Sequence, residues 1–234
     1  MAALPAQPLL LDLGSAVVSA GFSTRDHQAV IAELAELVEG APERAVAKRR
    51  AEFLAGRWAA RTALSALGVD ATPGRNEDGS PRWPAHTVGS ITHGADRALC
   101  AVARSSDVRS LGIDAERLMS HTASAELRAR ICAADELAIL REALQQPEHH
   151  GVTFAFSAKE SLYKCLHPLV KRFMDFSAAH VVSASAHTER ELVVGELGLE
   201  LRVDWSAEFS RGRVFRARFL ASPAHVESAV LLPA

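Results

Sequence analysis

Three stretches of the chain carry hydrophobic residues at helical spacing. Residues 29–38 and 42–67 repeat apolar side chains every three or four positions, which predicts two helices. Pro42 suits the first position of the second helix, and Gly68 suits its end. Residues 122–146 show the same period and predict one further amphipathic helix. Both halves of the chain are therefore expected to contain helix.

Short apolar runs predict strands on either side of the third helix. Those before it follow a loop at 72–84 that is dense in turn-forming residues. After it, two runs of alternating polarity flank a turn at 210–212, which is typical of a hairpin, and a last apolar run is typical of a closing strand. Because each half mixes helices with strands, the pattern predicts an α+β protein. The predicted strands are 90–94, 98–104, 110–116, 199–205, 213–220 and 229–233.

Composition limits the classes of function. Of the 234 residues, 48% are hydrophobic and 23% are charged, which is typical of a globular chain with a sizeable core. The formal net charge of −2 gives no basic field that would attract nucleic acid. Lysine and arginine nevertheless gather at 44–61 and at 171–172, so the composition does not exclude a local anion-binding site.

Cysteine usage and hydropathy indicate the compartment. The three cysteines (Cys100, Cys132 and Cys165) lack C-x-x-C spacing, which favours neither a disulfide framework nor a zinc site and fits a reducing compartment. The start of the chain lacks the pattern of a signal peptide, and no stretch approaches 18 consecutive apolar residues. We therefore expect a cytoplasmic protein without a membrane span.

An acidic pair lies on one of the predicted strands. In the sequence LGIDAER (111–117), alternation along the strand places Asp114 and Glu116 on one face and turns Leu111, Ile113 and Ala115 towards the core. Exposed acids at a strand edge would explain this pair on its own. Two carboxylates on one face also form a hard oxygen site of the kind that Mg²⁺ prefers, and a cation would relieve their mutual repulsion.

A second charged motif, FSAKESLYK, occupies residues 156–164. Ser157 and Glu160 have the spacing of a helix capping box, and Glu160 and Lys164 form a favourable i,i+4 pair, so an ordinary helix start would explain the motif. In a helical projection Glu160, Lys164 and His167 share one side, opposite the apolar side chains of Ala158, Leu162, Cys165 and Leu166. The charged side would then face a cleft or solvent.

Together these motifs resemble the signature of the 4′-phosphopantetheinyl transferase superfamily. That signature is G-[IV]-D-x-E, followed later in the chain by [FW]-[SC]-x-K-E-[SA]-x-x-K, and it matches residues 112–116 and 156–164 in the right order. Four further segments resemble the longer, monomeric type, which includes enterobactin synthetase component D and Sfp-like enzymes. They are the basic helix at 49–57, the loop at 79–84, the GSITH segment at 89–93 and the stretch 168–176.

The resemblance implies a reaction and a metal. The phosphopantetheine arm of coenzyme A would move to a serine of an apo carrier protein, releasing adenosine 3′,5′-bisphosphate. Asp114, Glu116 and Glu160 would hold Mg²⁺ on the pyrophosphate. Glu160 is also the candidate general base, and Lys164 would steady the charge on the leaving phosphate. The catalytic candidates are therefore Glu160, Lys164 and Asp114.

The resemblance also implies contacts for coenzyme A. Arg49, Arg57 and Arg75 match positions that clasp its 3′-phosphate, although Arg75 stands where relatives often carry lysine. A solvated stripe of arginines on the helix (Arg50, Arg57 and Arg61) is the alternative. Ser90, His93, Lys159 and Lys164 would contact the substrate as well, with a solvated lysine as the alternative for Lys159.

The implied fold has two similar-sized subdomains related by a pseudo-twofold axis, with coenzyme A in the cleft between them. Residues 1–117 would form the N-terminal subdomain and residues 118–234 the C-terminal one. Expected partners are coenzyme A and an apo acyl or peptidyl carrier protein. The protein is expected to be a monomer and to bind neither nucleic acid nor a membrane. Tyr163, Lys171 and Arg172 could meet an acidic carrier helix or belong to ordinary surface. A non-catalytic binding module and an unrelated Mg²⁺ enzyme acting on another diphosphate are the alternatives.

Overall fold

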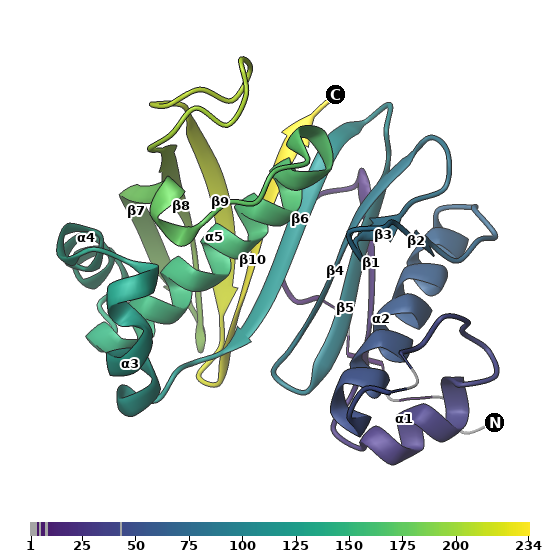
Figure 1. The fold of residues 1–234 in the computed structure, drawn as a ribbon. Coiled ribbons are helices and arrows are strands. Elements are labelled where there is room, and N and C mark those ends of the chain that lie inside the picture. The colour runs from purple at the N-terminus through teal and green to yellow at the C-terminus, as the bar shows by residue number, and fades with distance from the viewer. Residues whose placement is uncertain (1–3, 5, 8, 43) are drawn as a thin grey trace. The chain divides into compact units, whose positions relative to one another are not determined.

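The computed structural model describes residues 4, 6–7, 9–42 and 44–234. The chain divides into two compact units (Figure 1). Unit 1 contains residues up to Leu111 together with Pro233–Ala234, and unit 2 contains Gly112–Leu232. Strand β6 (Val108–Arg117) carries the chain from one unit to the other.

Unit 1 is built on a three-stranded antiparallel sheet in the order β1-β5-β4. Its central strand β5 is buried along almost its whole length. A two-stranded ribbon, β2 with β3, lies in the loop that precedes this sheet's β4. The elements are β1 (Val17–Ser23), α1 (His27–Leu34), α2 (Ala47–Ala66), β2 (Gly74–Arg75), β3 (Pro81–Arg82), β4 (Thr87–Gly94) and β5 (Arg97–Arg104).

Helix α2 packs an alanine-rich face against the sheet of unit 1. Side chains such as Leu54, Ala55 and Leu64 are fully buried, and a Cβ on Gly56 would collide with Ile91 of β4, so the glycine lets the helix come close. The helix ends where predicted, because Gly68 takes a left-handed φ of 81° and its N–H donates to the carbonyl of Ser65. The predicted start at Pro42 is wrong, since the helix begins at Ala47.

Unit 2 contains a five-stranded sheet in the order β6-β10-β9-β8-β7. The long helix α5 runs across this sheet (Figure 1), and its apolar side belongs to the main core cluster of the unit. The elements are β6, α3 (His121–Ile131), α4 (Ala134–Leu144), α5 (Glu148–Val170), a 3₁₀ turn (Phe176–Ala178), β7 (Ala179–Glu189), β8 (Leu192–Leu201), β9 (Val214–Ala221) and β10 (His225–Pro233).

Two helices replace the single helix predicted over 122–146. Helix α3 ends at Ile131, and Cys132 and Ala133 are extended. A carboxylate oxygen of Glu136 accepts the backbone N–H of Ala133 at 2.8 Å and so begins α4. The apolar period continues across this break, which is why the pattern did not reveal it.

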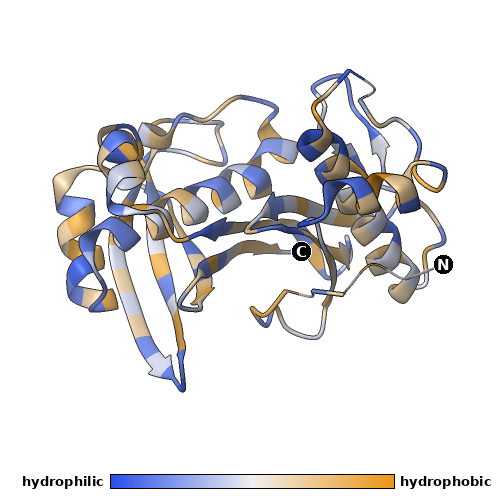
Figure 2. Ribbon diagram, turned by 90° about the horizontal axis from the view of Figure 1, so that it is seen from below, coloured by the Kyte–Doolittle hydropathy of each residue, from blue (hydrophilic) through white to orange (hydrophobic). Residues whose placement is uncertain are grey.

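The strands predicted at 90–94, 98–104, 110–116 and 229–233 are confirmed, with longer bounds, and the strand predicted at 213–220 is β9. The strand predicted at 199–205 is wrong beyond Leu201, where β8 ends, because the chain there turns away from the sheet and the N–H of Trp205 donates to the carbonyl of Phe209. The hairpin strands β8 and β9 pair antiparallel, with Glu200 opposite Val214, and β10 is the predicted closing strand. Strands β1 and β7 were not predicted, nor were the short strands β2 and β3 within the predicted loop 72–84. Hydrophilic and hydrophobic residues alternate along α2 and α5 (Figure 2), and the buried residues of both helices recur at helical spacing. None of the described helices combines the length and the hydropathy that a membrane-spanning helix needs.

Candidate active site

A glycine on β6 allows helix α5 to lie directly on the strand. A Cβ on Gly112 would overlap the carbonyl oxygen of Ser161 and the backbone nitrogen of Cys165. Any side chain at this position would push the helix away from the strand. The glycine of the GIDAE motif therefore sets the distance between the two charged motifs.

Small hydroxyl side chains fix the same helix on β10. The hydroxyls of Ser157 and Ser161 lie 2.8 and 2.7 Å from the hydroxyl of Ser228, and all three residues are buried. Ser157 is therefore not a helix cap. The motif 156–164 lies in the middle of α5, which begins at Glu148, so the interpretation of the motif as a helix start is wrong.

The helical projection of this motif is confirmed. The predicted apolar side (Ala158, Leu162, Cys165 and Leu166) is buried, while Glu160, Lys164 and His167 are partly exposed. Lys164 Nζ donates to Asp114 Oδ1 at 2.7 Å, which joins α5 to β6. The two motifs thus converge, although they are distant in the sequence.

Asp114 is more deeply buried than alternation along an edge strand suggests. It is only 2% exposed, because α5 covers the face of β6 that carries Gly112 and Asp114. Glu116, two residues further along, is partly exposed. The reading of Asp114 as an exposed edge acid is therefore wrong, and its carboxylate instead forms an ion pair with the lysine of the second motif.

Glu160 has an unusual electrostatic environment. Burial raises the pKa of its carboxyl group above 4.5, and the negative charge of Asp114 raises it further, whereas the ammonium of Lys164 lowers it. Glu160 and Asp114 are therefore close enough to repel each other. A carboxyl group with a raised pKa is suited to accept a proton, and a cation between the two acids would remove the repulsion.

This environment predicts a pH dependence of stability in the presence of a chelator. The folded pKa of Glu160 is raised, so its contribution to stability is complete below pH 4.5 and is lost as the pH rises through the folded pKa. We expect the Glu160→Gln protein to gain free energy of unfolding relative to wild type as the pH increases from 4 to 8. Urea unfolding at several pH values measures the difference, and a constant difference would contradict the assigned environment.

The donor set fits a magnesium site of the kind that is completed by a ligand. Within the described residues, no group of three or more His, Cys, Asp or Glu side chains could by itself hold a metal ion. Mg²⁺ commonly takes only one or two protein carboxylates and completes its shell with phosphate oxygens and water. Asp114 on β6 and Glu160 on α5 carry negative charges that repel each other. These two carboxylates are therefore suitable protein ligands for such a magnesium ion.

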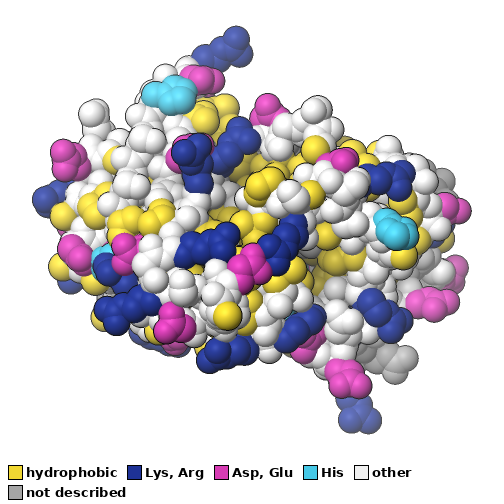
Figure 3. All heavy atoms as spheres, turned by 90° about the horizontal axis from the view of Figure 1, so that it is seen from above, with side chains coloured by type: hydrophobic (Ala, Val, Ile, Leu, Met, Phe, Trp, Pro, Cys, Tyr) yellow, Lys and Arg dark blue, Asp and Glu magenta, His cyan; other side chains and the backbone are white. Residues whose placement is uncertain are grey.

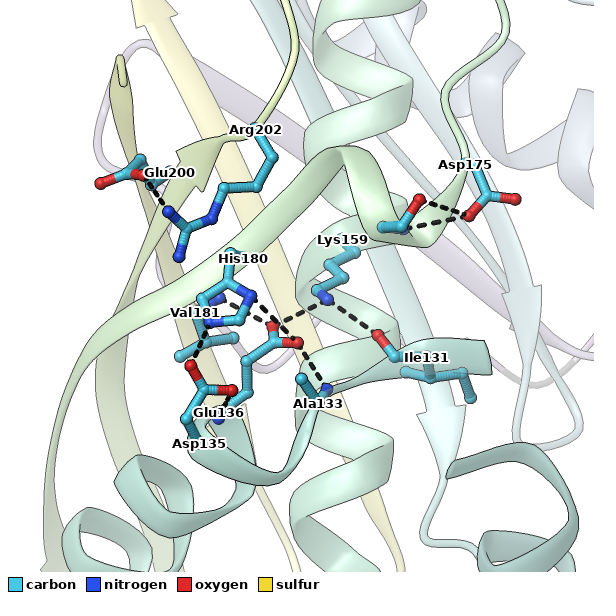
Figure 4. Close-up of polar contacts among 11 residues, drawn as sticks. Ile131, Ala133, Asp135, Glu136, Lys159, Asp175, His180, Val181, Glu200 and Arg202 are labelled. Atoms are coloured by element: carbon cyan, nitrogen blue, oxygen red, sulfur yellow. Dashed lines mark hydrogen bonds and ion pairs between the residues drawn. The ribbon is translucent and has the colours of Figure 1, made fainter. Parts of the chain in front are cut away.

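Lys159 lies elsewhere in unit 2, so the alternative of a solvated lysine is wrong and its contact with a phosphate stays a prediction. Its side chain is 1% exposed, and its ammonium forms an ion pair with Glu136 and donates to the carbonyl of Ile131 (Figure 4). The projection placed Lys159 at the flank of the helix, where α3 and α4 cover it. Nothing in the sequence around Glu136 identified this partner.

Unit 1 contains a separate cationic pocket of about 160 Å³. Arg57 is the most buried of its basic residues at 5% exposed, and its guanidinium donates to the carbonyl of Pro73. Burial and the nearby charge of Arg75 lower the pKa of Arg57, which shows that the two guanidinium groups repel each other. An anion would relieve this repulsion. The lining residues are Arg49, Glu52, Phe53, Gly56, Arg57, Arg75, Gly79, Pro81, Ile91 and His93.

Three of the predicted arginines and His93 thus line one pocket. The guanidinium of Arg49 lies 3.1 Å from Nε2 of His93, so this nitrogen accepts and the ring proton is on Nδ1, which lies 3.8 Å from Glu52. The alternative of a solvated stripe is wrong for Arg57, since this side chain is buried. Glu52 was not singled out from the sequence, although its four-residue offset from Lys48 is a recognisable pair.

Ser90 and Trp83 are not among the residues that line this pocket. Ser90 lies on β4 and is 5% exposed, so little of it can reach a ligand directly. The indole ring of Trp83 lies against Gly89, where a Cβ would overlap it, and it packs on the core cluster of α2 and β5. Trp83 is therefore a packing residue.

The surface seen in Figure 3 intersperses basic with acidic side chains, in keeping with the small net charge.

Comparison with known proteins assigns the region that contains the pocket of unit 1 and the region that contains β6 and α5 to the same family. Residues 34–103 match the 4′-phosphopantetheinyl transferase N-terminal domain, and residues 110–215 match the 4′-phosphopantetheinyl transferase superfamily. The chain is 38% identical over 197 residues to 4′-phosphopantetheinyl transferase Svp of Streptomyces mobaraensis, which covers 77% of this chain and 76% of the relative. The chain belongs to the 4′-phosphopantetheinyl transferase superfamily.

Other relatives match over a shorter region. Enterobactin synthase component D of Salmonella typhimurium is 42% identical over 139 residues, which is 59% of this chain and 57% of that protein. 4′-phosphopantetheinyl transferase PptT of Mycobacterium tuberculosis is 39% identical over 156 residues, or 63% of this chain and 65% of the relative. The matched region thus spans little more than half the length of the enterobactin synthase components.

Proposed function

We propose that this protein transfers the 4′-phosphopantetheine arm of coenzyme A to a serine of an apo carrier protein. The serine oxygen attacks the phosphorus that bears the pantetheine, and a new P–O bond forms. The bond from that phosphorus to the bridging pyrophosphate oxygen breaks, so adenosine 3′,5′-bisphosphate leaves. The serine proton passes to a base. The observation that carries this proposal is the convergence of Asp114, Glu160 and Lys164 in a member of the superfamily.

The chemistry requires positioning and neutralisation of charge. Asp114, Glu160 and Glu116 would hold Mg²⁺, which when bound would neutralise the charge of the pyrophosphate. Glu160, whose pKa is raised by burial, is suited to receive the serine proton directly or through water. A carboxylate that binds metal tightly is a weaker base, so the two roles of Glu160 oppose each other.

Lys164 has a defined position for a role in leaving-group stabilisation. The ammonium of Lys164 forms an ion pair with Asp114 of β6, and the lysine side chain is 26% exposed. The ammonium can therefore reach a ligand while the ion pair holds it in place. A preorganised cation next to the breaking bond stabilises the charge that develops on the leaving phosphate.

The pocket of unit 1 would bind the 3′-phosphate of coenzyme A. Forked guanidinium donors suit the dianionic phosphate monoester, and Arg57 and Arg75 already repel each other without an anion. Arg49 and His93 line the same pocket. Ser90 precedes the pocket residue Ile91 on β4, and a direct contact of Ser90 with coenzyme A rests on the family resemblance. The predicted pseudo-twofold relation of the two units and a shared coenzyme A site remain part of the proposal and rest on the family resemblance, as do a monomeric state and a cytoplasmic location.

The function is tested by incubating the protein with coenzyme A, Mg²⁺ and a panel of apo acyl and peptidyl carrier proteins. Mass spectrometry should show one added phosphopantetheine on a carrier serine, and excess EDTA should abolish the addition because the carboxylates need a cation to receive the pyrophosphate. Coenzyme A binding without transfer to any carrier would instead indicate a binding module. Full transfer in excess EDTA, with no tightly bound metal, would contradict the carboxylate site.

A further prediction concerns Arg49. The Arg49→Ala protein should bind coenzyme A about 10- to 100-fold more weakly, because hydrogen bonds to charged groups contribute roughly 1.5–3 kcal/mol. Binding of dephospho-coenzyme A, which lacks the 3′-phosphate, should change less than about threefold. Isothermal titration calorimetry measures both dissociation constants. Arg44→Ala, an exposed arginine that does not line the pocket, is the control, and equal losses for both ligands would show that Arg49 has another role.

A further inference from the structure

Neighbouring residues of the second motif point in different directions and have different surroundings. Glu160 is partly exposed next to Asp114 and Lys164, whereas Lys159 is fully buried in unit 2. The ammonium of Lys159 lies 2.8 Å from Oε1 of Glu136 and 2.7 Å from the carbonyl oxygen of Ile131 (Figure 4). The reaction proposed above makes no use of this buried lysine.

The carboxylate of Glu136 contacts three other residues as well as Lys159. Oε1 accepts the backbone N–H of Val181 on β7 at 2.8 Å, and Oε2 accepts the N–H of Ala133 at the start of α4 at 2.8 Å. Nδ1 of His180 lies 3.4 Å from the same carboxylate, and Nε2 of this histidine bonds to Asp135 (Figure 4). One buried group thus connects helix α4, strand β7 and the middle of helix α5.

Buried ion pairs are weak evidence for stability, because their desolvation cost offsets their attraction. Such pairs can instead fix one arrangement among similar ones. The contacts of Ser157 and Ser161 with Ser228 hold α5 on the side that packs on the sheet. The bonds of Lys159 hold the same helix on a different side, against Glu136 of α4 and Ile131 of α3. An ammonium that is held there by two acceptors limits rotation of the helix about the serine contacts.

We propose that the Lys159–Glu136 pair is a positioning pair, which fixes the rotation of α5 so that Glu160 and Lys164 face Asp114. Lys159 therefore acts on the transfer reaction through its neighbours on the helix and does not touch the substrate. The inference rests on the proposed function and adds two residues to it. A direct contact between Lys159 and a coenzyme A phosphate is the competing interpretation.

The pair is tested with Lys159→Met, Glu136→Gln and the double variant. Removal of one partner from a buried pair leaves an uncompensated charge, so a single variant can fail to fold. The double variant carries neither charge and keeps the interior neutral, and it supplies the decisive measurement. We expect it to melt as one cooperative unit, with kcat for transfer reduced about 10- to 100-fold, as for displaced supporting residues, and with the dissociation constant for coenzyme A within about threefold of wild type.

The measurements separate the two interpretations. A positioning pair predicts that any folded single variant loses about as much kcat as the double variant, since each removes the same unit. A phosphate contact predicts weaker binding of coenzyme A after Lys159→Met and an unaltered kcat after Glu136→Gln. Wild-type kcat in the double variant, or a loss confined to coenzyme A affinity, overturns the proposal.

A second ion pair of unit 2 provides a matched control. Arg128 and Glu148 join α3 to the start of α5 at 3.0 Å, but both side chains are about half exposed, at 55% and 47%. Arg128→Met with Glu148→Gln should leave kcat unchanged, because exposed pairs contribute little. If wild-type protein transfers to no carrier, the proposed function itself fails; if wild type transfers and the Lys159 double variant equals it, only the positioning role fails.

Discussion

The Glu160→Gln protein should lose transfer by at least about a hundredfold while keeping a melting temperature at or above that of wild type. The substitution retains the size and shape of the side chain and removes only its charge. The position lies inside α5, twelve residues after the helix begins at Glu148, so no helix cap is lost. What is lost is a carboxylate that would bind Mg²⁺ and receive the serine proton.

The control for this prediction is Glu142→Gln. Glu142 lies on α4 of the same unit and is exposed, so its charge should be irrelevant to transfer. Single-turnover mass spectrometry of an apo carrier compares the two variants with wild type at saturating coenzyme A. Full activity of the Glu160→Gln protein would refute the proposed mechanism, whatever family the chain belongs to.

The parts of the site that the sequence predicted are those set by periodicity. A projection of residues 158–167 separates the buried side of α5 from its charged side, because adjacent positions of a helix differ by about 100°. Alternation on β6 places Asp114 on the face opposite Ile113. Both inferences need only the local sequence, and the family signature added the expectation that these two faces meet.

The parts that the sequence did not predict depend on remote partners. Burial of Lys159 requires the carboxylate of Glu136, which reaches it only because α4 begins immediately after the extended residues Cys132 and Ala133. The apolar period runs through that break and hides it. Strand β7 combines small and polar residues, so its alternation is weak, and only its pairing with β8 defines it as a strand.

The start of α5 was missed for a similar reason. Pro147 precedes the helix without a side-chain cap, and the polar residues that follow resemble a loop. The pattern S-x-x-E at Ser157 predicted that a helix starts there. In the folded protein tertiary packing continues the helix through this position. The hydroxyl of Ser157 instead lies in the interior against Ser228, a contact across 71 positions of the chain.

The Asp114→Asn protein should show a comparable loss of transfer, together with a higher requirement for Mg²⁺. Asp114 is almost fully buried, and its Oδ1 holds the ammonium of Lys164 at 2.7 Å. Asparagine keeps the shape of this side chain but cannot neutralise Lys164 or a metal ion. The lysine is 26% exposed and can turn towards water, so the protein should remain folded.

Two consequences of this substitution distinguish a metal ligand from a structural ion pair. If Asp114 binds the metal, the concentration of Mg²⁺ at half-maximal transfer should rise by about tenfold or more, since a charged ligand has been replaced by a neutral one. Loss of the ion pair alone would lower activity at every Mg²⁺ concentration and leave that midpoint unchanged. A titration of transfer rate against Mg²⁺, with circular dichroism to verify folding, measures both. An unchanged midpoint would assign Asp114 to the orientation of Lys164, and the carboxylates that receive the cation would then be Glu160 and Glu116.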